Sequence, residues 1–432
     1  MRIADGAVVE HARRASAALP ALRHAARPRL PLTRRRPNAV PPRHRGATYA
    51  AGVSVATFSI DPVTGRLGVS LDGATRAVPA LWLREQSRDP SQLDLVSDQR
   101  LFDPHLLPVD LDIVEARVDA GADGTWVWAR FSDGHAERFD ATELAIAIDP
   151  DDGCPDPIAW RSDLGTPPRH DWRELHRPAA LEAALHDFLA YGTIVVHDSP
   201  TTEGTVLEVA GTFGYVRETN FGRLFDVRSV PRSNDLAYRP VPLGPHTDNP
   251  YRVPTPGIQL LHCLVNDTSG GLSTLVDAIA VTDQLRAEDP AGFDLLVDTM
   301  VRFHFRDDDT ALESYRPIVD VDHRRRVTGL HYSPRLDHLP LMDDERTRAF
   351  HRARRRLAEL LSDPAFEIRF ALQPGEAMVF SNDRVLHGRT GFDPQEGPRH
   401  LQGCYIDHDA PRSRYRVLRR QLSRPFARSG EG

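Results

Sequence analysis

Short apolar segments, interrupted by glycine and proline, constrain the fold of this 432-residue chain more than any other feature. In the larger expected domain, residues 171–425, helical spacing over 179–189 and 205–213 flanks the apolar run Ile194–Val196, which is typical of a buried strand. Asp344–Leu361 has the spacing of an arginine-rich amphipathic helix, and the remaining segments alternate short strands with turns. This mixture predicts a β-sandwich or barrel with supporting helices.

A smaller β-rich domain is expected at residues 47–148. Within it, Trp126–Phe131 and Ala136–Phe139 are strand-like and are separated by Ser132–Gly134, which is a good hairpin signal. The proline-rich, acidic stretch 149–170 predicts a linker between the two domains.

Arginine is unevenly distributed along the chain. All 54 residues of the Lys+Arg total are arginines, and residues 1–46 hold eleven of them against Asp5 and Glu10, although the net charge of the chain is -7. The rest of the chain is therefore acidic, which disfavours binding to nucleic acids. Residues 1–46 are expected to be a disordered extension, with an organellar presequence as the alternative.

The apolar runs and the cysteines indicate the expected location of the protein in the cell. No run approaches the roughly 20 apolar residues that cross a bilayer, so no membrane-spanning segment is expected. Cys154, Cys263 and Cys404 are too far apart in sequence for a disulfide framework or a CxxC zinc knuckle. A reducing cytoplasm is the expected location.

His246-Thr247-Asp248 is the first candidate metal-binding motif. On a strand, residues i and i+2 point to the same face, so the imidazole and the carboxylate can bind one metal. A chain with 19 histidines and this aspartate content contains about two such triplets by chance. The triplet alone therefore does not indicate a metal site, and the evidence must come from the neighbouring residues.

Those neighbours form long motifs, Gly244–Tyr251, Pro256–Cys263 and Phe380–Arg389. With them, the chain from about Trp82 to Leu418 resembles the iron- and 2-oxoglutarate-dependent dioxygenases, and it is most similar to the gamma-butyrobetaine and trimethyllysine dioxygenases of the taurine dioxygenase superfamily. The resemblance implies a mainly β, α+β fold. A double-stranded β-helix (jelly roll) with flanking helices would form the catalytic domain, beside the small β-rich N-terminal domain.

The candidate metal ligands are His246, Asp248 and His387. Two histidines and one carboxylate leave three positions of an octahedral metal open, which suits non-haem Fe(II) chemistry with 2-oxoglutarate and dioxygen. A four-ligand structural zinc site would leave no such vacancy.

The resemblance also indicates residues for 2-oxoglutarate. It assigns Arg399 to the distal carboxylate, which a guanidinium can bind through two hydrogen bonds. Ser273 and Leu261 are the other expected contacts, and the adjacent Thr274 is an alternative hydroxyl.

For the substrate, the resemblance implies an aromatic cage that binds a trimethylammonium group by cation–π attraction. Core packing is the alternative role for these rings, and Arg252 and Arg335 are either ligands for an acidic tail or solvated surface residues. The candidate substrate-binding residues are Phe221, Phe225, Tyr238, Tyr405, Asn249, Arg252 and Arg335.

The small domain departs from the family pattern. Leu81–Glu85 resembles the start of a zinc-binding module, but Gln86–Pro90 stands where its cysteines are expected, so no structural zinc is expected. The resemblance implies that the domain still serves a dimer or lid role, which makes a homodimer the expected assembly.

The predicted activity is hydroxylation of a C–H bond in a small quaternary ammonium compound, with formation of succinate and carbon dioxide. Gamma-butyrobetaine, trimethyllysine and trimethylaminoethylphosphonate represent the expected substrate class. One alternative is a taurine-dioxygenase-like hydroxylase of a non-cationic acid or sulfonate. The other is a non-catalytic jelly-roll metal sensor, against which Arg399 argues because a metal binder needs no buried co-substrate anchor.

Overall fold

A computed structural model describes most of the chain. The described residues are 56–71, 73–148, 150, 152–228 and 241–423. The predictions for residues 1–46 and for Tyr238 therefore lie outside the described residues.

The N-terminal part, residues 56–148, contains antiparallel sheets and two short helices, α1 (Ala80–Glu85) and α2 (Ala141–Ile148). Its strands are β1 (Thr57–Ile60), β2 (Leu67–Leu71), β3 (Ala74–Ala77), β4 (Leu93–Asp94), β5 (Gln99–Arg100), β6 (Ile113–Gly121), β7 (Gly124–Phe131) and β8 (Ala136–Asp140). The pairing of β7 with β8 confirms the predicted hairpin. These elements enclose a hydrophobic core of their own, which includes Phe58, Leu67, Leu83, Val127 and Phe131.

The segment Gln86–Pro90, where the resemblance led us to expect cysteines, follows α1 directly. Arg84, at the end of this helix, is buried and donates hydrogen bonds to Asp133 and Gln92. Ser87 donates to Glu137. Polar contacts thus connect this segment to the β7–β8 hairpin, and the absence of zinc stays a prediction.

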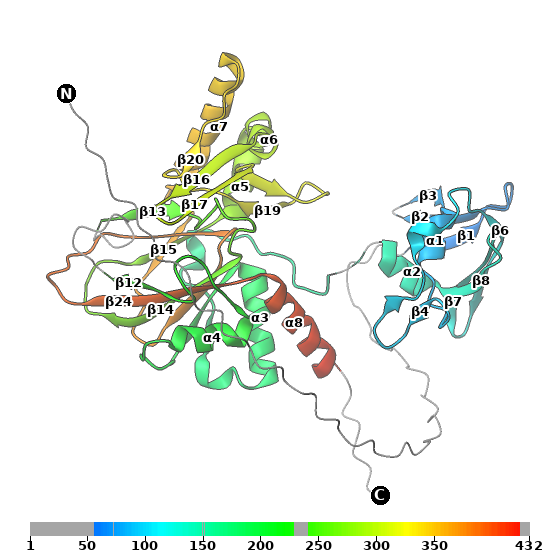
Figure 1. The fold of residues 1–432 in the computed structure, drawn as a ribbon, viewed down its shortest axis with the longest axis horizontal. Helices are drawn as coiled ribbons and strands as arrows, with labels where there is room; N and C mark the ends of the chain where they lie inside the picture. Colours follow the sequence, from blue (N-terminus) through cyan, green and yellow to red (C-terminus); the bar gives the residue numbers. More distant parts are fainter. Residues whose placement is uncertain (1–55, 72, 149, 151, 229–240, 424–432) are drawn as a thin grey trace, which may run out of the picture. The chain divides into compact units, whose positions relative to one another are not determined.

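The C-terminal part is a double-stranded β-helix made of two sheets (Figure 1), as predicted. The major sheet consists of β11 (Val216–Arg217), β24 (Arg399–Ile406), β14 (Ile258–Asn266), β22 (Ala377–Ser381), β10 (Thr193–His197) and β9 (Arg169–Asp171), with β12 (Phe225–Arg228) paired to β24. The minor sheet consists of β13 (Leu243–His246), β23 (Val385–Arg389), β15 (Ser273–Asp277) and β21 (Glu367–Phe370). Side chains from both sheets meet in one buried cluster, which defines the interior of the β-helix and includes Leu275, Met378, Phe380 and Leu401.

Helices cover the outer faces of both sheets (Figure 1). Because side chains alternate along a strand, Val379 and Cys404 of the major sheet point outward and pack under α3 (Pro178–Tyr191), α4 (Thr205–Phe213) and α8 (Asp409–Leu422). Val276 and Leu386 of the minor sheet pack under a second group of elements. These are α5 (Ala278–Glu288), α6 (Pro290–Asp298), α7 (Asp344–Leu361), β16 (Val301–Arg306), β17 (Ala311–Arg316), β18 (Val319–Val321), β19 (Val327–Leu330) and β20 (Asp337–His338).

The predicted helices at 205–213 and 344–361 are confirmed, and the longer one begins where the Asp343 side chain caps it by accepting from the Arg346 N–H. No helix within the described ranges has both the length and the apolar composition that a membrane crossing requires.

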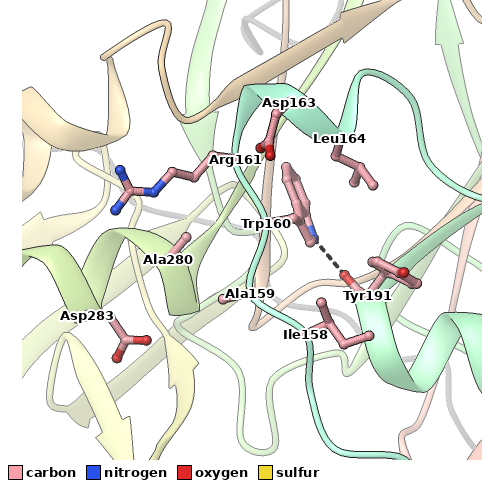
Figure 2. A pocket seen from close by; sticks show the side chains of 9 residues that line it. All are labelled: Ile158, Ala159, Trp160, Arg161, Asp163, Leu164, Tyr191, Ala280 and Asp283. Atoms are coloured by element: carbon pink, nitrogen blue, oxygen red, sulfur yellow. Dashed lines mark hydrogen bonds between the residues drawn. The ribbon is translucent and has the colours of Figure 1, made fainter.

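Within the predicted linker, 149–170, the structure differs from the expectation at Trp160. Trp160 is buried, its indole N–H donates to the Tyr191 carbonyl (Figure 2), and its backbone N–H donates to Asp277. The indole and the backbone therefore enter the core with their polar groups satisfied, which proline content alone could not reveal. Trp160 also lines a surface depression that includes none of the predicted site residues.

Candidate active site

His246, Asp248 and His387 converge in the structure, and one potential ligand atom from each lies within 4.8 Å of the others. His246 ends β13 directly opposite His387 on β23, and their ring centroids are 4.3 Å apart. Asp248 Oδ1 lies 3.4 Å from His246 Nε2, and its Oδ2 lies 3.8 Å from His387 Nε2. The sheet register thus places two imidazoles and one carboxylate around a single point.

Asp248 does not share a strand with His246, which corrects the expectation of i and i+2 on one strand face. β13 ends at His246, and Asn382 holds the next segment from the loop before β23. Asn382 Oδ1 accepts from the Asp248 N–H at 2.8 Å, and Asn382 Nδ2 donates to the Asp248 carbonyl at 2.9 Å. Asn249 then adopts a left-handed φ of 54°, a conformation that asparagine tolerates. The loop conformation, rather than strand alternation, directs the carboxylate.

The protonation states of the three residues suit metal binding. His246 Nδ1 donates to the Gly244 carbonyl at 3.0 Å, which leaves the lone pair on Nε2. Burial, and then the nearby His246, lower the pKa of His387 to about 3, so this imidazole is neutral. Although burial opposes ionisation of Asp248, His387, His246 and Tyr405 hold its pKa well below the usual range. Two imidazole nitrogens and a carboxylate are a fitting ligand set for Fe(II).

A second His–Asp cluster is formed by Asp171, His197 and Asp198. Arg173 donates to Asp171 at 2.7 Å and to Asp198 at 3.1 Å, so a guanidinium already neutralises both carboxylates. Asp198 is also exposed. This cluster is an ion-pair network and provides a natural control for the buried one.

Arg399 starts β24 and is 8% exposed. Its Nη2 donates to the Gly271 carbonyl at 3.3 Å, while its buried Nε has no hydrogen-bond partner among the described residues. A Cβ at Gly271 would lie 2.9 Å from Nε, so the glycine lets the guanidinium approach the chain closely. No ion pair with a described carboxylate neutralises Arg399, so this buried cation suits a carboxylate ligand such as 2-oxoglutarate.

The other 2-oxoglutarate candidates lie on neighbouring strands. Ser273 is buried and shares a face of β15 with the interior residue Leu275, which is paired with His387. Thr274 is on the opposite face, so the structure places Ser273, and not Thr274, toward the interior. Leu261 packs against the interior cluster from β14.

Two of the aromatic candidates border the metal-binding residues. The rings of Phe225 and Tyr405 lie 5.2 Å apart, and the Tyr405 hydroxyl donates to Asp248 Oδ2 at 2.9 Å. A Cβ at Gly403 would lie 2.5 Å from the Phe225 ring, so this glycine makes room for the ring. Burial and the Asp248 carboxylate raise the pKa of Tyr405 well above its usual value, so the hydroxyl stays a donor.

Phe221 has different neighbours. Its ring meets the edge of Phe305 at 6.1 Å, and the Arg252 guanidinium lies 5.9 Å from its centroid and 5.7 Å from that of Tyr251. Arg252 also donates to Asn220. A protein cation therefore lies near the aromatic ring at which the family resemblance implied a substrate cation.

The remaining candidates are dispersed. Asn249 is buried and accepts from the Tyr251 hydroxyl, while its Nδ2 has no partner among the described residues. Arg335 is exposed, but its charge contributes to the lowered pKa of His387, so it acts on the metal-binding residues electrostatically. The sequence patterns did not single out Asn382 as a functional residue. The only sequence feature that could have indicated it is its position inside the motif Phe380–Arg389.

Replacing Asn382 with alanine is expected to destabilise the protein. Asn382 is fully buried, and the change leaves the Asp248 N–H and two carbonyls, of Asp248 and Pro256, without their partner. Unsatisfied buried groups cost about 1–3 kcal/mol each, so we expect a loss of at least about 2 kcal/mol in denaturant unfolding. Asn220→Ala, at an exposed position, should change stability by less than about 0.5 kcal/mol. Equal effects would show that Asn382 does not hold the loop.

Comparisons with known proteins agree with this geometry. Residues 161–405 match the family described as taurine catabolism dioxygenase TauD, TfdA family. The chain is similar to gamma-butyrobetaine dioxygenase of Pseudomonas sp. (strain AK-1), with 33% identity over 88% of this chain and 97% of that protein. It is also similar to dioxygenase str8 of Strobilurus tenacellus (30% identity, 79% of this chain, 85% of that protein) and to mitochondrial trimethyllysine dioxygenase of Mus musculus (28%, 78% and 82%). The chain belongs to the TauD, TfdA family and is a 2-oxoglutarate-dependent dioxygenase that uses Fe(II).

Proposed function

We propose that this dioxygenase hydroxylates a C–H bond of a small quaternary ammonium compound with an acidic tail, such as gamma-butyrobetaine or trimethyllysine. The observation that carries the proposal is the Phe225–Tyr405 pair, which lies beside the Asp248 carboxylate. Aromatic faces attract a cationic head group. Two of the relatives are named for trimethylammonium substrates, which supports the same class.

The residues of the site have different roles in catalysis. When bound, Fe(II) and 2-oxoglutarate would supply, with dioxygen as the oxidant, the chemistry for C–H hydroxylation, in which 2-oxoglutarate is converted to succinate and carbon dioxide. His246, Asp248 and His387 hold the metal, and Arg399 holds the distal carboxylate of the co-substrate. Phe380 packs on the His387 ring with a centroid distance of 4.8 Å, which shields this ligand from water.

Substrate orientation follows from the charges around the triad. A trimethylammonium head at Phe225 and Tyr405 would gain about 0.5–2 kcal/mol of cation–π attraction. Arg335, whose charge contributes to the lowered pKa of His387, is the candidate partner for the acidic tail. Binding the trimethylammonium head and the acidic tail at separate places fixes which C–H bond of the substrate faces the metal.

Succinate release tests the proposal with a trimethylammonium substrate and its neutral tert-butyl isostere. We expect wild-type protein to prefer the cation by about 5- to 30-fold in kcat/KM, equivalent to about 1–2 kcal/mol. Phe225→Leu keeps an apolar side chain but removes the ring, so it should reduce turnover of the cation selectively.

Phe221→Leu is the matched control, because the Phe221 ring lies against Phe305 and near Arg252. It should reduce the cation preference less than Phe225→Leu does. Equal turnover of the two compounds by wild-type protein would reject a quaternary ammonium substrate.

The second candidate function is hydroxylation of a non-cationic acid or sulfonate. The position of Arg252 over Phe221 and Tyr251 favours it, because a cation fixed there attracts an anion and repels an ammonium group. A sulfonate such as taurine, assayed by succinate release, should then outperform the betaines. Arg252→Ala should abolish that advantage.

A further inference from the structure

The hydroxyl of Tyr405 is committed to one oxygen of a metal ligand. Tyr405 lies on β24 opposite Gln259 of β14, is 4% exposed, and donates to Asp248 Oδ2 at 2.9 Å. The other oxygen, Oδ1, lies 3.4 Å from His246 Nε2, whereas Oδ2 is the oxygen nearer His387 Nε2, at 3.8 Å. The two carboxylate oxygens therefore have different surroundings before any metal binds.

This difference bears on how many positions the metal keeps open. A carboxylate can bind a cation through one oxygen or through both. The Tyr405 hydroxyl takes up one lone pair of Oδ2 and makes it the weaker ligand, which favours Oδ1 for the metal. His246, Asp248 and His387 then supply three ligands in total. A carboxylate bound through both oxygens would supply a fourth ligand and leave too few positions for a chelating co-substrate and dioxygen.

The ring of the same tyrosine belongs to the aromatic pair with Phe225. Tyr405 thus connects the proposed binding site of the substrate cation with a metal ligand through a single rigid side chain. The family resemblance suggested only the ring as functional, whereas the structure gives the hydroxyl a separate partner.

We propose that Tyr405 is a positioning residue whose hydroxyl fixes the orientation of the Asp248 carboxylate, so that Asp248 meets the metal as a one-oxygen ligand, independently of what the Tyr405 ring contributes to substrate binding. This inference rests on the proposed function, because it concerns the Fe(II) and the substrate of that site.

Tyr405→Phe tests the inference, because it removes the hydroxyl and keeps the ring. In anaerobic titrations, we expect the Kd for Fe(II) to rise by about 10- to 100-fold, the usual loss when the hydrogen-bond partner of a ligand is removed. The preference for the cation over its neutral isostere should persist. Tyr405→Leu should weaken Fe(II) binding similarly and, in addition, lose that preference.

Tyr251→Phe is the matched control. It also removes a buried tyrosine hydroxyl, but that hydroxyl donates to Asn249 rather than to a metal ligand, so the Kd for Fe(II) should stay within about twofold. Far-UV circular dichroism and metal-free thermal unfolding verify that each variant is folded. An unchanged Kd for Fe(II) in folded Tyr405→Phe would overturn the inference.

A crystal structure of the wild-type protein with Fe(II) and 2-oxoglutarate provides a test that needs no variant. Asp248 should bind the metal through one oxygen while the other accepts from Tyr405, and binding through both oxygens would overturn the inference. If wild-type protein binds Fe(II) and 2-oxoglutarate but turns over no quaternary ammonium compound, the proposed function fails while the role of Tyr405 stands.

Discussion

Asp248→Ala is expected to abolish iron binding and turnover together. The change removes the only anionic residue of the three assigned ligands and leaves two imidazoles, which hold Fe(II) weakly. In the absence of oxygen, wild-type protein with Fe(II) and 2-oxoglutarate should develop a visible charge-transfer band, because the keto acid chelates the metal. The variant should show no band and no succinate release at any concentration of either compound.

Asp198→Ala is the control for this experiment. It removes a carboxylate from the cluster of Asp171, His197 and Asp198, where the Arg173 guanidinium already forms an ion pair with Asp198. Iron binding, the charge-transfer band and turnover should all match those of the wild-type protein. A band that survives in Asp248→Ala would mean that the metal binds elsewhere and would refute the assignment of all three ligands.

The parts of the fold that the sequence predicted are those dominated by local pattern. The helix at Asp344–Leu361 has a strong amphipathic period and an aspartate cap, both of which can be read within one stretch of chain. The β7–β8 hairpin is encoded by a turn between two alternating segments. In contrast, the buried role of Trp160 depends on Asp277 and Tyr191, which are remote in sequence, so the local proline content was misleading.

The same distinction applies to the site. The motifs identified His246 and His387, but only the register between β13 and β23 sets the two rings opposite each other. Asp248 was identified for a local reason, strand alternation, that the structure replaces with the long-range contact from Asn382. The family resemblance indicated Tyr405 as a candidate for the aromatic cage, but the partner of its hydroxyl could not be predicted, because Asp248 lies in the loop after another strand.

Arg399→Ala is expected to raise the 2-oxoglutarate requirement by about 10²- to 10³-fold, equivalent to about 3–4 kcal/mol, while Fe(II) binding is retained. The size of the effect follows from burial, since a desolvated guanidinium–carboxylate pair loses far more than a surface pair when one partner is removed. Arg399→Lys keeps the charge but not the paired N–H donors, so it should recover only part of the affinity. A 2-oxoglutarate KM within about threefold of the wild-type value in Arg399→Ala would place the co-substrate anchor elsewhere.

Stability measurements separate this arginine from one that is purely structural. Arg384 is buried as well, but Asp277 and the carbonyls of Ala190 and Ile158 accept its hydrogen bonds. Arg384→Ala leaves the buried Asp277 carboxylate unpaired and should lower the free energy of unfolding by about 3–5 kcal/mol.

Arg399→Ala instead removes a buried cation that no described carboxylate neutralises, so the ligand-free protein should be equally stable or more stable. Adding 2-oxoglutarate to the Fe(II)-loaded proteins should then raise the Tm of the wild-type protein and of Arg384→Ala but not of Arg399→Ala, because only a ligand that binds the folded state stabilises it. These Tm changes would show that Arg399 binds the ligand and does not stabilise the fold.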